Sequence, residues 1–124
     1  MQIPNPIVRT TAALVAATLF TTPLYAGDMP NAQEIAEAVS DHTYQGSMSA
    51  GGSGFAEYYA PDGSIRGVDY SGKWRTEDGV MCFKYGDGED RCFEVTLDGP
   101  SMVMLKDGKI DGNGMLIKGN PQGF

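Results

Sequence analysis

From residue 43 onward, short runs of alternating apolar and polar residues are separated by Asp-Gly pairs, which begin at residues 62, 78, 87, 98, 107 and 111. Such pairs favour hairpin turns, because both residues tolerate the positive φ that a type I′ turn requires. The runs cover residues 44–49, 55–60, 65–70, 73–76, 80–85, 92–97, 101–105 and 115–118. Eight runs at a spacing of about nine residues are typical of an up-and-down antiparallel sheet. Since such a sheet twists and tends to close, we expect a mainly β fold, with a small barrel as the first choice.

A helical pattern precedes the predicted sheet. Asn31 and Glu34 match a capping box, in which two side chains satisfy free amide groups at the start of a helix. One face at helical spacing carries Ala32, Ile35, Ala36 and Val39. This pattern predicts one short N-terminal helix over residues 32–40. Because its apolar face is narrow and mostly alanine, we expect it to lie against the sheet or to plug an open end of a barrel.

The first 26 residues have the features of an export signal. Residues 1–9 carry one positive charge, residues 10–24 carry none, and Ala26 closes a Leu-Tyr-Ala cleavage signal. The uncharged run is about 15 residues long, shorter than the roughly 20 that a membrane-spanning helix needs. We therefore expect residues 1–26 to be a signal peptide that is removed. Residues 27–124 would then form a single β-barrel-like domain in the periplasm or outside the cell.

The predicted mature chain is strongly acidic. Removal of the signal takes away Arg9, which leaves 8 basic against 16 acidic residues and a net charge of −8. An acidic surface disfavours nucleic acids and anionic membranes, because binding to them depends on basic side chains. A basic protein or a cation is the electrostatically favoured partner, although plain solubility also accounts for the charge.

The two cysteines lie in the stretch MCFKYGDGEDRCF, residues 81–93. A hairpin that places Cys82 opposite Cys92 gives both strands one apolar face and puts the cysteines on the other face. The predicted apolar face carries Met81, Phe83, Tyr85, Phe93 and Val95. Two cysteines in an exported protein are expected to form a disulfide. A redox site would call for Cys-x-x-Cys at a helix start and a zinc site for four ligands, and the sequence has neither.

The loop between the cysteines contains Asp87, Glu89 and Asp90. We name these three residues as candidate contacts with a protein partner, with a solvated hairpin tip as the alternative. The loop lacks the alternating oxygen ligands of a calcium-binding signature, so no metal is expected there. Met102 and Met104 share one face of a strand, where thioethers either bind Cu(I) or, as is commoner, fill the core. No cofactor is predicted.

Aromatic residues gather in residues 55–75, and we name Tyr58, Tyr70 and Trp74 as candidate ligand-binding residues. Tyr and Trp combine a large contact area with a polar group, so they suit binding surfaces as well as interiors. The lumen of an eight-stranded barrel is either filled by side chains or holds one small ligand. Core packing and ligand binding both stay open for these residues.

Catalytic patterns are weak in this sequence. It has no Gly-x-Ser-x-Gly motif, and its one histidine, His42, has no evident catalytic partner and is expected to stabilise the end of the helix. Glu57 and Asp69 would serve as a glycosidase pair if neighbouring strands brought them together. With 16 acidic residues in the chain, such proximity is also expected by chance. We therefore do not expect an enzyme.

The segments YYAPDGSIRG, YSGKWRTEDGVMCFKY and DRCF together resemble a pattern in small secreted proteins of Gram-negative, especially alphaproteobacterial, bacteria whose function is unknown. The resemblance covers residues 55–97 and implies a β fold and a periplasmic location. A weaker similarity is to periplasmic lysozyme inhibitors. The leading hypothesis is a noncatalytic binding module for a protein or a small ligand. The alternative is an acidic inhibitor of a basic enzyme such as a lysozyme, and an enzyme of unknown type comes third.

Overall fold

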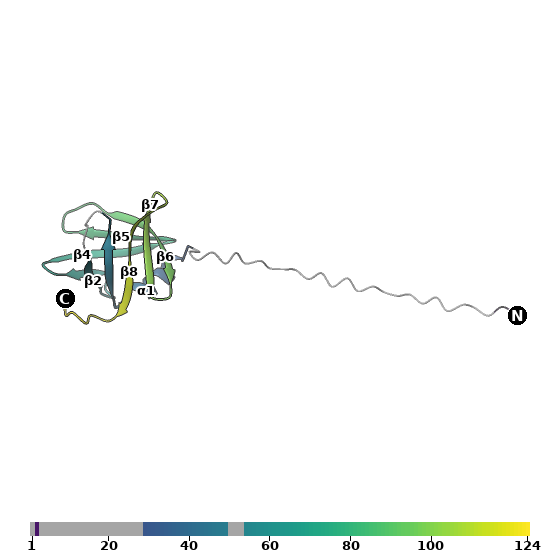
Figure 1. Ribbon diagram of the computed structural model, residues 1–124, viewed down its shortest axis with the longest axis horizontal. Helices are drawn as coiled ribbons and strands as arrows, with labels where there is room; N and C mark the ends of the chain where they lie inside the picture. Colours follow the sequence, from purple (N-terminus) through teal and green to yellow (C-terminus); the bar gives the residue numbers. More distant parts are fainter. Residues whose placement is uncertain (1, 3–28, 50–53) are drawn as a thin grey trace.

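The structure is a computed structural model that describes residues 2, 29–49 and 54–124. Eight antiparallel strands form a closed barrel, in which each strand pairs with its neighbours along the chain and β1 pairs with β8 (Figure 1). The strands are β1 (His42–Met48), β2 (Phe55–Tyr59), β3 (Ser64–Gly67), β4 (Tyr70–Glu77), β5 (Val80–Tyr85), β6 (Arg91–Asp98), β7 (Ser101–Lys106) and β8 (Lys109–Lys118). The mainly β fold and the barrel are thus confirmed. The predicted signal peptide lies outside the described residues, apart from Gln2, and stays a prediction.

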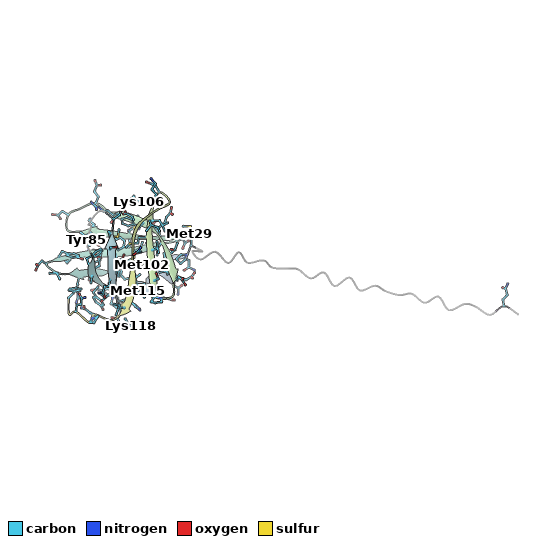
Figure 2. The ribbon with its side chains drawn as sticks, in the orientation of Figure 1. Met29, Tyr85, Met102, Lys106, Met115 and Lys118 are labelled. Atoms are coloured by element: carbon cyan, nitrogen blue, oxygen red, sulfur yellow. A yellow bond between two sulfur atoms is a disulfide. The ribbon has the colours of Figure 1, made fainter. Side chains whose placement is uncertain are left out.

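The β5–β6 hairpin has the predicted register, with Cys82 opposite Cys92 and Met81 opposite Phe93. Its inward face carries Met81, Phe83 and Val95. Since successive residues of a strand point to opposite sides, this register assigns each inward side chain of the two strands. Met102 and Met104 of β7 are also buried in the core, and Figure 2 shows Met102 within the barrel. Both methionines therefore pack in the core.

The helix α1 (Ala32–Val39) plugs one end of the barrel. Its capping box is present, because Asn31 Oδ1 accepts from Glu34 N at 2.8 Å and Glu34 reaches back to Asn31 N. Ile35 and Val39 are fully buried and join the barrel core. The helix ends at Val39, one residue earlier than predicted, and Ser40 is its C-cap. Within the described part of the chain, no helix is long and apolar enough to cross a membrane.

Hydrogen bonds fix α1 to the turn between β4 and β5. Asp78 Oδ1 accepts from Ala32 N at 3.0 Å, and Thr76 Oγ1 donates to Ala32 O at 2.8 Å. Gly79 N donates to Pro30 O at 2.7 Å. These contacts hold the helix at the end where β4 finishes and β5 begins. The other end of the barrel is reached by the β5–β6 and β7–β8 loops.

Two predicted strand boundaries were wrong. The expected run 65–70 is interrupted, because β3 stops at Gly67 and Tyr70 begins β4, with Asp69 in the turn at φ 62°. The Asp111-Gly112 pair, expected to form a turn, lies inside β8, where Gly112 pairs with Met48 and Met104. The turn between β7 and β8 uses the preceding Asp107-Gly108 pair, and an irregularity between Met104 and Leu105 absorbs the shift in register. Pairing on both sides therefore overrides the local preference of Asp-Gly for a turn.

The predicted disulfide between Cys82 and Cys92 is confirmed, with their Cα atoms 4.0 Å apart. It joins β5 to β6 on the face opposite the core side chains. A disulfide is compatible with an oxidising location such as the periplasm or the extracellular space.

Replacing both cysteines, Cys82→Ala with Cys92→Ala, tests the contribution of this bond to stability. The bond closes a loop with a sequence separation of 10, so its loss should lower the free energy of unfolding by about 3 kcal/mol in the chain-entropy model. Urea unfolding of the wild type, oxidised and reduced, and of the double variant measures this change. A double variant as stable as the oxidised wild type would contradict the prediction.

Candidate functional site

The barrel is hollow at the end opposite α1, where a cavity of about 140 Å³ opens. In Figure 2, Lys106, the last residue of β7, and Lys118, the last residue of β8, lie at opposite ends of the barrel. Six strands contribute to the wall, namely β1, β2, β5, β6, β7 and β8. The lining residues are Met48, Phe55, Glu57, Tyr59, Phe83, Tyr85, Arg91, Phe93, Met104 and Asp111. The cavity is thus mostly aromatic and apolar, with a few polar groups.

Glu57 is the buried polar group of the cavity, and only 2% of it is exposed. It lies inside because it shares the inward face of β2 with Phe55 and Tyr59. Tyr85 Oη, from β5, donates to the two carboxyl oxygens of Glu57 at 3.0 and 2.8 Å. Tyr70 Oη, from the start of β4, donates to Oε1 at 3.2 Å. A buried carboxyl group is therefore held by two hydroxyl groups from other strands.

Burial makes the carboxyl group of Glu57 harder to ionise. It raises the pKa of Glu57, and the hydrogen bonds from Tyr85 and Tyr70 offset only part of that rise. Burial and the nearby Glu57 charge raise the pKa of Tyr44 to about 12. The same two causes raise the pKa values of Tyr59, Tyr70 and Tyr85. The tyrosines therefore remain protonated over the range in which Glu57 titrates, and they remain donors.

Glu57 has no cationic partner among the described residues. The ion pairs found there join Arg75 to Glu77 and Asp90, and Lys118 to Asp41. Arg91 lines the same cavity, but it is exposed and forms none of these pairs. Within residues 29–49 and 54–124, the carboxyl group is therefore compensated by neutral hydrogen-bond donors alone.

Aromatic rings surround the carboxyl group. Phe83 contacts Tyr59, Tyr85 and Phe93, with ring centroids 6.0, 6.4 and 5.9 Å apart. The ammonium group of Lys106 lies 5.4 Å from the centroid of Phe93. One ring of the wall is thus already in a cation–π contact within the chain.

The structure does not bring the three predicted ligand-binding aromatic residues together. Tyr58 follows the inward Glu57 and so points outward, where its Oη donates to Asp41 Oδ1 at 2.7 Å. Trp74 packs against the core beside Tyr59, and its Nε1 donates to Ala60 O at 3.0 Å. Of the three, only Tyr70 contacts Glu57.

The predicted partner-binding residues Asp87, Glu89 and Asp90 are all exposed on the loop between β5 and β6. Asp90 Oδ2 accepts from Arg75 at 3.4 Å. Among residues 29–49 and 54–124, no group of three His, Cys, Asp or Glu side chains is placed to hold a metal ion.

The structure does not support the glycosidase pair that the sequence suggested. Glu57 points into the barrel, whereas Asp69 sits in the exposed turn before β4. His42 begins β1, and its Nδ1 lies 2.8 Å from Ser40 O. It therefore lies at the α1 end and does not line the cavity.

Sequence reasoning missed Glu57 and Tyr85 as parts of one site. A signal was present in FAEYY, residues 55–59, where Glu57 lies two residues from Phe55 and two from Tyr59 and so shares a strand face with both. If the aromatic residues of this strand point inward, this spacing places the carboxyl group inside as well.

Comparisons with models of protein families, with curated proteins and with solved structures found no match. The fold and the site therefore define the protein as a closed eight-stranded barrel with a small cavity that has a carboxyl group in its wall. Function has to be inferred from this geometry.

Substituting Glu57→Gln tests the cost of its ionisation. The pKa of Glu57 in the folded protein is raised above the ordinary 4.5. The stability that the protonated group contributes is therefore fully present below the unfolded pKa, and it is lost as the pH rises through the folded pKa. The wild type should therefore lose stability relative to Glu57→Gln as the pH rises from about 4 to about 8.

The measurement is the free energy of unfolding of both proteins across this range. Asp41 and Asp62 have lowered pKa values and contribute the opposite trend, but they are shared by both proteins and cancel in the difference. A difference that is flat, or that increases in favour of the wild type, would contradict the prediction.

Proposed function

We propose that this protein is an exported, noncatalytic binding module that holds one small ligand in the open end of its barrel. The observation that carries the proposal is the cavity of about 140 Å³ with a buried, hydrogen-bonded carboxyl group in its wall. Ligand sites are typically apolar hollows with a few fixed polar groups, and they often lie in the mouths of β-barrels. The arrangement around Glu57 has this character.

The volume limits the size of the ligand. Drug-sized molecules occupy sites of about 300–1,000 Å³, whereas a cavity of about 150 Å³ accommodates benzene. The cavity here, at about 140 Å³, suits one ring or a short alkyl chain. A larger ligand would have to extend beyond the rim.

The composition of the wall supports binding rather than catalysis. Among the described lining residues there is no serine, cysteine or histidine, so the wall lacks the common nucleophiles, and the carboxyl group of Glu57 is held by tyrosine hydroxyl groups. The carboxyl group of Asp111 lies near Ser49, whose Oγ donates to it. Export is supported by the signal-like residues 1–26 and by the Cys82–Cys92 disulfide, which suits an oxidising compartment.

Filling the cavity from its rim tests the proposal. Met48 lines the cavity and is partly buried, so Met48→Trp should obstruct it. Met115 of β8 points outward and is 48% exposed, which makes Met115→Trp the matched control. NMR titration of the ¹⁵N-labelled protein with benzene-sized molecules should shift amides of the lining residues in the wild type and the control. Affinity should fall at least about tenfold in Met48→Trp, which corresponds to about 1.4 kcal/mol. Equal affinities in all three proteins, or shifts confined to other surfaces, would refute a ligand site in the cavity.

A second candidate function is the inhibition of a basic enzyme. It is favoured by the exposure of Asp87, Glu89 and Asp90 on one loop, the base of which is held by the disulfide. Acidic side chains on an exposed loop accelerate encounters with a basic partner.

Salt dependence tests this candidate. The association rate with a basic enzyme such as a lysozyme should fall markedly from low to physiological ionic strength, because the exposed charges become screened. A variant with Asp87→Asn, Glu89→Gln and Asp90→Asn should bind as slowly at low salt as the wild type does at high salt. Surface plasmon resonance measures both rates. Equal rates for the two proteins at low salt would exclude this loop as the inhibitory surface.

A further inference from the structure

Among the described residues, no basic side chain forms an ion pair with the carboxyl group in the cavity. Glu57 is almost fully buried, its hydrogen-bond partners Tyr70 and Tyr85 are neutral, and none of the ion pairs in the described part of the chain includes it. A buried ionised carboxylate without a cation is costly, so a cation that enters the cavity gains a strong interaction. A charge-assisted hydrogen bond to the carboxylate would also be about twice as strong as one between neutral groups.

The aromatic wall favours the same sign of charge. The faces of Phe and Tyr rings are electron-rich and attract ammonium groups within about 6 Å. Lys106 shows this attraction within the chain, since its Nζ lies 5.4 Å from the centroid of Phe93. Rings of Phe55, Phe83 and Tyr85 line the same cavity.

The basic groups near the cavity do not reverse this preference. Arg91 and Lys106 are exposed, so solvent and salt screen their charges, whereas the charge of Glu57 lies in a medium of low polarity. An anionic ligand at the same depth would face both the carboxylate and the ring faces. A neutral ligand would leave the carboxylate without a counter-ion.

We infer that the ligand is a small organic monocation, an ammonium group on one aromatic ring or a short aliphatic chain, and that Glu57 is its counter-ion. This inference rests on the proposed function of the cavity and specifies the chemical class of its ligand. The volume of about 140 Å³ sets the size of the body that carries the charge.

Three probes of nearly equal size separate the inference from the proposed function. Benzylamine, benzyl alcohol and benzoate are titrated into the wild-type protein near neutral pH, with NMR shifts of the lining residues as the readout. Benzylamine should bind at least tenfold more tightly than benzyl alcohol, and benzoate should bind weakest. Binding of benzyl alcohol or benzoate as tight as that of benzylamine would overturn the inference and leave the ligand site standing. Absence of binding by all three would overturn the inference together with the proposed site.

The variant Glu57→Gln identifies the counter-ion. Its preference for benzylamine over benzyl alcohol should disappear, while Glu94→Gln, on the exposed face of β6, should keep it. Near-ultraviolet circular dichroism checks that each variant is folded. Retention of the preference in Glu57→Gln, with its loss in Asp111→Asn, would place the counter-ion at Asp111 and overturn the inference.

A pH profile of the wild type gives a test that needs no substitution. The titratable and charged groups around Glu57 are Tyr44, Tyr59, Tyr70 and Tyr85, with Arg91, Lys106 and Asp111 on the strands that line the mouth. The tyrosines have raised pKa values and stay neutral near and below neutral pH. Benzylamine affinity should therefore fall as the pH drops through the pKa of Glu57, while that of benzyl alcohol stays constant. An affinity for benzylamine that does not change with pH in this range would overturn the inference.

Discussion

Closure of the sheet through the pairing of β1 with β8 is the constraint on which the rest of the structure depends. It removes both sheet edges and gives every strand an inward and an outward face. Gly46 lies opposite Gly114 in this pairing. A Cβ atom on Gly114 would lie 2.6 Å from the ring of Tyr44, so the absence of a side chain there lets Tyr44 lie across the seam. The same closure encloses Glu57, which lies on the inward face of β2 and is only 2% exposed.

The two ends of the barrel differ in how they are filled. At one end, Ile35 and Val39 of α1 complete the core, and hydrogen bonds with Thr76, Asp78 and Gly79 hold the start of the helix in place. At the other end, inward side chains leave a hollow, and Glu57 takes a position that an apolar residue would fill at lower cost. A buried carboxyl group weakens the fold when it ionises, because burial disfavours its charged form. The hydroxyl groups of Tyr70 and Tyr85 offset part of this cost.

The disulfide and the site act on opposite faces of the same hairpin. Cys82 and Cys92 join β5 to β6 on the outer side, and the register that they share places Phe83 and Phe93 inside. The bond therefore contributes to the shape of the cavity, although neither cysteine is among its described lining residues. The bond also restrains the base of the acidic loop between β5 and β6. The proposed ligand site and the proposed inhibitory loop would therefore both be affected by its loss.

Sequence alone determined the features that depend on neighbours along the chain. The capping box at Asn31, the register of Cys82 with Cys92, and the succession of short antiparallel strands all follow from local spacing. Only the tertiary structure decided that Asp111-Gly112 continues β8, because two flanking strands pair with it there. Only the tertiary structure shows that Tyr58 bonds Asp41 on the outside of the barrel, whereas Tyr70 and Tyr85 both donate to Glu57. These residues come from three strands. The environment of a buried charge is set by groups that the folded barrel brings together, and no local pattern in the sequence records that arrangement.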